Sequence, residues 1–214
     1  FGSLTNSPEL ELEILRGVIR IVLDDEVFTS SPTLTPEYLD SVDVLVLSSI
    51  FTTNQAITPL SAAEQTALYN YVLGGGYLLL AVEDDAFSAH ADQTHESFLD
   101  PFGLSVTGRI FGSPTTLYSY GRATDLTHPI FHGPLGDFFE PFEMHAAGWL
   151  DDLGPYARPI AESDVNHFPV LAVIDRNAMA PGSGKVVIGT DTHLWMSDIN
   201  MVGNLALYFA TPEP

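Results

Sequence analysis

Three consecutive acidic residues, Glu83, Asp84 and Asp85, directly follow the apolar run Tyr77–Val82. A nearly continuous apolar run of this kind indicates a strand that is buried on both faces. In open α/β sheets, ligands bind in the crevice at the carboxyl ends of the strands. Two of the three carboxylates could meet a cation or a sugar hydroxyl there. The alternative is that the triplet caps a helix and is otherwise solvated.

A second acidic group follows another apolar run. Asp191 and His193 come just after Lys185–Gly189, which we also predict to be a strand. In a parallel sheet this places them at the same end as Glu83. A carboxylate and an imidazole at that position could act as an acid and a base, or as metal ligands. The alternative is that Asp191 caps a turn and His193 packs beside Trp195.

Two serines end the first strong apolar run. Ser48 and Ser49 follow Val42–Leu47. No Gly-x-Ser-x-Gly elbow surrounds them, so neither serine is expected to be a nucleophile. Ser48 is included in the predicted crevice only as a polar group that faces a ligand.

One histidine-rich segment is a candidate metal site. His90, Asp92, His95 and Glu96 lie close together, but their spacing matches no tight metal signature such as His-Glu-x-x-His. Such a segment could bind zinc, although a polar surface loop is the favoured interpretation. No cofactor is evident, although a divalent cation, calcium or zinc, could bind. A calcium site would be irregular, because the sequence contains neither an EF-hand loop nor a calcium-binding nonapeptide repeat.

A third acidic group consists of Glu140, Glu143 and His145, which lie beside several phenylalanines. Aromatic rings interleaved with acids are common in carbohydrate sites, where rings stack on sugar faces and carboxylates accept hydrogen bonds from hydroxyls. The same pattern is equally typical of a half-buried strand or helix face. Both interpretations remain open from the sequence.

The elements that would position these groups alternate along the chain. Val42–Ser48 is predicted to be a strand, Ser61 and Glu64 form a capping box that opens a helix, and Gly74 ends that helix before the next strand. This order predicts a right-handed parallel βαβ unit. Further strands are predicted at Leu104–Phe111, Pro169–Asp175 and Lys185–Gly189, and helices at Ser7–Val22, Leu34–Leu39 and Asp198–Ala210. We therefore predict an α/β fold, with an open, mostly parallel sheet and helices on both faces.

Several motifs in this order resemble those of a known superfamily. The matching segments are Asp43–Leu47, Leu60–Glu64, Tyr71–Gly76, His128–Ile130 with Gly133, Gly184–Gly189 with Asp191, and Asn204-Leu205. Together they resemble the class I glutamine amidotransferase-like superfamily in its non-catalytic branches, which include DUF4350-type bacterial domains and the GIFT domain of an intraflagellar transport protein. The resemblance spans roughly residues 35 to 210 and implies a flavodoxin-like fold.

The chain departs from that superfamily where its enzymes carry their chemistry. Those enzymes hold a cysteine within Gly-x-Cys-x-Gly after the strand that corresponds to Tyr77–Val82, whereas this chain has Glu83-Asp84-Asp85 there and contains no cysteine. Where the enzymes carry His-Pro-Glu, this chain has Gly189–His193. Glutamine hydrolysis by the usual route is therefore excluded.

The amino-acid composition limits the classes of molecule that the chain is expected to bind. The chain has 214 residues, 28 acidic and 7 basic, and a formal net charge of −21. Such a field repels nucleic acids and anionic membrane surfaces. No apolar run reaches the roughly 18 residues that a membrane span needs. The absence of cysteine also excludes a disulfide scaffold and a thiolate zinc site.

We expect one domain over residues 1–210, followed by the start of a tail at 211–214. The ending Pro212-Glu213-Pro214 resembles the start of the PEP-CTERM sorting signal of bacteria, although the hydrophobic helix and basic cluster of that signal do not follow. This resemblance and the acid-rich composition favour an extracytoplasmic, bacterial protein, secreted or on the cell surface.

The resulting hypothesis is a non-enzymatic domain that binds a carbohydrate or a protein partner in the predicted crevice. The alternatives are a hydrolase that uses the crevice carboxylates and histidine, with or without a divalent metal, and a purely structural surface domain. No catalytic residue is assigned.

Overall fold

The computed structural model describes residues 33–48, 59–83, 91–112, 118–138, 141–191, 193–194 and 198–210. The predicted helix Ser7–Val22 and the tail at 211–214 lie outside these residues. The described helices are α2 (Pro36–Leu39), α3 (Ala62–Leu73), α4 (Ala91–Leu99), the 3₁₀ helix η1 (Asp100–Phe102) and α5 (Ile199–Ala210). The described strands are β1 (Val44–Ser48), β2 (Tyr77–Ala81), β3 (Leu104–Thr107), β4 (Tyr118–Ala123), β5 (His132–Gly133), β6 (Gly136–Asp137), β7 (Phe142–His145), β8 (Trp149–Leu153), β9 (Arg158–Ser163), β10 (Pro169–Ile174) and β11 (Val186–Gly189).

The predicted βαβ unit is confirmed. Ser61 is the N-cap of α3, where its hydroxyl accepts the Glu64 N–H and the Glu64 carboxylate accepts the Ser61 N–H. Gly74 ends the helix, and β2 then pairs with β1 in parallel. Local capping chemistry determines both ends of this helix.

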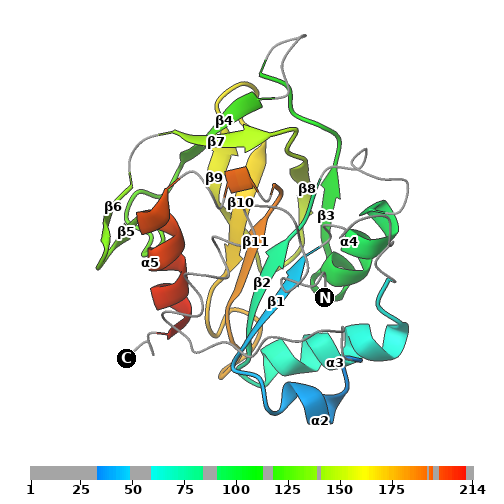
Figure 1. Cartoon of the computed structure of the whole chain (residues 1–214). Helices are drawn as coiled ribbons and strands as arrows, with labels where there is room; N and C mark the ends of the chain where they lie inside the picture. Colours follow the sequence, from blue (N-terminus) through cyan, green and yellow to red (C-terminus); the bar gives the residue numbers. More distant parts are fainter. Residues whose placement is uncertain are drawn as a thin grey trace.

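The predicted flavodoxin-like, mostly parallel α/β sheet is wrong. The main sheet is a curled, mixed sheet of seven strands in the order β1-β2-β11-β10-β9-β4-β7 (Figure 1). Only the pairings of β2 with β1 and β11 are parallel, and the other four are antiparallel. The described part of the chain is rich in strands and has four α-helices.

The error has a physical cause. Strand β10 is apolar along its length because it is buried on both faces, and burial of this kind is typical of parallel strands. The turn at Ala180–Gly184 instead joins β10 to β11 as an antiparallel pair, since a parallel connection requires a longer crossover. Burial therefore identifies the strand without giving its direction.

Two apolar cores lie on opposite faces of the sheet. Helices α2, α3 and α4 pack on one face, and α5 packs on the other (Figure 1). Strands β2, β10 and β11 contribute side chains to both cores. Strands β4, β7 and β9 contribute only to the core that contains α5, for example through Phe142, Met144 and Ile160. The opposite face of β4 and β7 therefore lies outside the core formed with α2, α3 and α4.

Candidate functional site

The carboxyl ends of β2 and β11 bring two of the predicted site residues to one edge of the sheet. Ala81 pairs with Gly189, and the Val82 N–H donates to the Gly189 carbonyl at 2.9 Å. Glu83 and Asp191 each follow two residues after this pair, and both side chains are buried. The parallel register thus places these two carboxylates at the same edge.

Asp191 organises backbone at this edge. It is 2% exposed, and its carboxylate accepts the His145 N–H at 2.5 Å and the His193 N–H at 2.8 Å. The first bond reaches the end of β7, and the second closes the turn that follows β11. One buried carboxylate therefore fixes two histidines relative to each other.

His193 is held on its ring side as well. Its Nε2 lies 3.1 Å from Oε1 of Glu143, which projects from β7 two residues before His145. Which of these atoms carries the proton depends on the tautomer of His193. The sequence places Glu143 and His193 in two separate candidate groups, and the fold joins them.

Tyr118 completes a compact cluster. It is paired with His145 across β4 and β7, and their rings stack with centroids 4.7 Å apart at 21°. The His193 ring lies edge-on to both, with centroids 6.1 Å from Tyr118 and 6.0 Å from His145. The four side chains of Tyr118, Glu143, His145 and His193 therefore form one aromatic and polar group, which we call the ring cluster.

The ring cluster continues along β4. Tyr118 and Tyr120 alternate with buried residues and are 48% and 46% exposed. Gly121, the next residue along β4, lies so close to the Phe142 ring that a Cβ on Gly121 would be 2.2 Å from Cε2 of Phe142. Strand β4 therefore packs tightly against β7, and Tyr120 faces outward opposite Glu143. We call Tyr118, Tyr120, Glu143, His145 and His193 the open face.

The structure says less about the other site residues predicted from the sequence. Asp84 and Asp85 lie outside the described residues, and Ser48 ends β1 without a described side chain. His90 lies outside the described residues, but Asp92, His95 and Glu96 lie in α4 instead of a polar loop, and His95 is buried, so that prediction is wrong. Among the described residues, no group of three or more His, Asp or Glu side chains is placed to hold a metal ion.

Sequence reasoning missed the two tyrosines. The run Tyr118-Ser119-Tyr120-Gly121 alternates aromatic with small residues, which is a strand signal with one aromatic face. This alternation is the only local signal that could have identified them. The pairing of β4 with β7 depends on residues far apart in sequence, which no local pattern gives.

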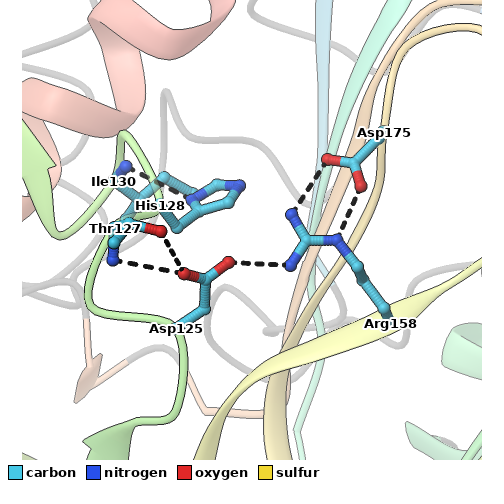
Figure 2. Close-up of polar contacts among 6 residues, drawn as sticks. All are labelled: Asp125, Thr127, His128, Ile130, Arg158 and Asp175. Carbon is cyan, nitrogen blue, oxygen red and sulfur yellow. Dashed lines mark hydrogen bonds and ion pairs between the residues drawn. The ribbon is translucent and has the colours of Figure 1, made fainter.

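A second polar group lies elsewhere in the sheet (Figure 2). Arg158 donates through Nε to Asp175 at 2.6 Å and through Nη1 to Asp125 at 3.0 Å. The hydrogen bond from Thr127 holds the pKa of Asp125 below its ordinary value, with further help from Arg158. The hydrogen bond to Asp175 raises the pKa of Arg158. These charges satisfy one another, which favours a structural role.

His128 lies beside this group. Its Nδ1 accepts the Ile130 N–H at 3.3 Å, and its backbone closes the turn that begins at Asp125. His128 therefore shapes this turn. Burial lowers the pKa of His128 to about 4, and the charge of Arg158 contributes in the same direction.

Comparison with known proteins bears on the fold alone. No protein-family model matches the chain, and no curated protein matches it in sequence. The structure is similar to the mmIFT52 N-terminal domain, with a TM-score of 0.71 and 14% identity over 99% of this chain and 97% of that chain. It is also similar to part of a β-galactosidase from Bacillus circulans sp. alkalophilus (TM-score 0.60, 10% identity, 94% of this chain and 26% of that chain). A cytoplasmic protein, STM1381 from Salmonella typhimurium LT2, gives a TM-score of 0.57 and 16% identity over 92% of this chain and 86% of that chain.

The sequence predicts no membrane-spanning segment. In the described segments, no helix has both the length and the apolar character needed to cross a membrane.

Proposed function

We propose that the chain is a non-enzymatic, extracytoplasmic binding domain whose open face takes a carbohydrate. The observation that carries this proposal is the pair of half-exposed tyrosines, Tyr118 and Tyr120, on one face of a well-packed strand. Tyrosine combines an apolar ring with a polar hydroxyl, which suits the apolar faces and hydroxyl edges of a sugar. Two rings on one strand would stack on successive sugar units.

The polar groups beside the rings suit sugar hydroxyls. Glu143 lies opposite Tyr120, and its carboxylate oxygens accept hydrogen bonds. His193 and His145 flank Tyr118 and can donate or accept, depending on tautomer. A few convergent polar groups among rings are what orient a small ligand in a binding site.

Charge favours a neutral or cationic sugar. The chain carries a net charge of −21, and Glu143 adds a carboxylate on the open face itself. A uronic acid or sulfated sugar would meet repulsion at close range and over the whole surface. Neutral hexose chains and amino sugars meet none, so we expect these classes to bind.

The arrangement of the carboxylates favours binding over hydrolysis. Glycoside hydrolysis uses two carboxyl groups that flank the scissile bond. In the ring cluster, Glu143 is near His193, while the Asp191 carboxylate accepts two backbone N–H groups and is buried. Asp191 therefore supports the cluster from beneath instead of facing a ligand.

The test is a binding screen of the purified chain against neutral oligosaccharides, cationic chitosan oligosaccharides and polygalacturonate. Tyr118→Ala and Tyr120→Ala should each weaken binding of the neutral or amino sugars. Leu126→Ala is the matched control, because Leu126 is 48% exposed and lies outside the open face. Release of shorter sugars that is lost in Glu143→Gln would support the hydrolase alternative. No binding to any sugar would contradict the proposal.

A further inference from the structure

A buried lysine contacts the C-terminal end of α5. Lys185 is 1% exposed, and its Nζ donates to the Tyr208 carbonyl at 2.9 Å. The same Nζ lies 4.1 Å from the centroid of the Tyr208 ring and 5.6 Å from that of Tyr77. Carbonyls in the last turn of a helix lack partners within the helix, and a cation there also meets the negative end of the helix dipole. Lys185 therefore caps α5 from the sheet.

His128 touches the same tyrosine. Its ring centroid lies 5.0 Å from that of Tyr208, and the side chain is 3% exposed. Because Nδ1 accepts the Ile130 N–H, the neutral ring carries its proton on Nε2. Within the described residues, Nε2 has no hydrogen-bond partner. The ring is thus held neutral by one local bond and by apolar packing against α5.

The turn that contains His128 is also tied to α5. Asn204, one turn before Tyr208, accepts the Leu135 N–H at 3.0 Å and donates to the Gly136 carbonyl at 2.9 Å. A weaker contact of 3.5 Å reaches the Ile130 carbonyl. The segment 128–136 and α5 therefore support each other through Asn204, Tyr208 and His128.

Four charged groups on neighbouring segments act on His128, and α5 itself carries no charged side chain. Lys185, which precedes β11, and Arg158 from β9 disfavour a second cation, while Asp125 from the turn and Asp175 after β10 favour one. Burial is the largest effect and disfavours the charged ring. The balance lowers the pKa of His128 to about 4 from an ordinary 6.5.

We propose that protonation of His128 causes α5 to leave the sheet. A proton on Nδ1 removes the acceptor for the Ile130 N–H and places a cation beside Lys185. Undocking exposes the imidazole to water, where the charged form is stable. Strands β1, β2, β10 and β11 keep the core on the opposite face, which contains α2, α3 and α4. Acid would therefore open the α5 face before the rest of the chain unfolds.

The expected size follows from the two pKa values. A ring that titrates near 6.5 when exposed and about 4 when docked should raise the undocked population about 30-fold between pH 7.5 and pH 5. The same relation gives an increase of roughly 150-fold by pH 4.

The test uses the absence of cysteine in the chain. Ala206→Cys places one thiol in the buried face of α5, and Ala172→Cys places one in β10 as the control. Labelling by 4,4′-dithiodipyridine is measured from pH 7.5 to pH 4 and divided by the rate for the urea-unfolded chain at each pH. Between pH 7.5 and pH 5 we expect about 30-fold acceleration for the Ala206→Cys variant and little change for the Ala172→Cys variant.

His128→Asn supplies the decisive comparison, because asparagine can accept the Ile130 N–H and does not titrate in this range. The acceleration seen with Ala206→Cys should disappear in this background. Equal acceleration at both thiol positions, or acceleration that survives His128→Asn, would overturn the proposal. If His128→Asn does not fold, an NMR titration of the unsubstituted chain gives the same decision: the His128 imidazole must titrate together with the loss of α5 amide protection, and separate transitions would overturn it.

Discussion

Replacement of Asp191 by asparagine should destabilise the fold well beyond an ordinary Asp-to-Asn change. The carboxylate is buried and accepts the His145 N–H through one oxygen and the His193 N–H through the other. Asparagine retains one acceptor and turns an NH₂ group toward the second N–H. Hydrogen bonds to a charged group contribute roughly 1.5–3 kcal/mol, and a buried donor without a partner costs roughly 1–3 kcal/mol. We therefore expect a loss of about 2–4 kcal/mol in the free energy of unfolding.

Asp198→Asn is the matched control. Asp198 precedes α5, and a single oxygen, Oδ1, accepts both the Asn200 N–H and the Met201 N–H. Asparagine keeps that oxygen and is as good an N-cap as aspartate, so the change should cost less than about 0.5 kcal/mol. Urea unfolding at pH 7.5 measures both variants. Equal stability of the Asp191→Asn and Asp198→Asn variants would refute the assignment of Asp191 as the group that orders the cluster.

The remaining predictions concern pH and capping. The unfolded state binds the His128 proton near pH 6.5 and the folded state near 4, so the free energy of unfolding should fall by about 3 kcal/mol as the pH drops through this window. Urea unfolding of the unsubstituted chain and of the His128→Asn variant at pH 7.5 and pH 4 should show this difference. Parallel pH profiles of the two chains would contradict it. The Asp125 carboxyl has a lowered pKa, so its contribution is present above pH 3.8 and should disappear only below that value, which an Asp125→Asn comparison below pH 3.8 measures. Ser61→Ala should cost about 1 kcal/mol by removing one half of the α3 capping box, whereas Ser41→Ala, at an exposed hydroxyl outside the helices, should cost less in the same thermal melts.

Local chemistry made part of the fold predictable. Ser61 with Glu64 indicates the start of α3 correctly, because caps depend on neighbours a few residues away. The helix predicted at Leu34–Leu39 corresponds to α2, which begins at Pro36. The apolar runs of β1, β2, β10 and β11 also identify these segments as strands. Their directions were not all predictable, since burial on both faces looks the same in parallel and antiparallel strands.

Long-range pairing accounts for what was missed. Strands β7, β8 and β9 carry acids at exposed or half-buried positions, so their apolar signal is short and broken. Their stability comes from partners distant in sequence, such as Phe142 packed against Gly121. The sequence could suggest Asp191, His193 and Glu143 separately, but their meeting depends on two long-range contacts. The pairing of β4 with β7 brings Tyr118 to the strand that carries Glu143, and Asp191 links His193 to the same strand through the His145 N–H.

The most direct test of the proposed carbohydrate site is calorimetric titration of the chain with a neutral oligosaccharide identified in the screen. The measurement compares the unsubstituted chain, the Tyr118→Ala/Tyr120→Ala double variant and the Leu126→Ala control. Each stacked ring should contribute roughly 0.5–1.5 kcal/mol, so the double variant should lose roughly 1–3 kcal/mol, a factor of about 5 to 150 in affinity, while the control binds normally. Unchanged affinity in the double variant would show that the open face is not where sugar binds.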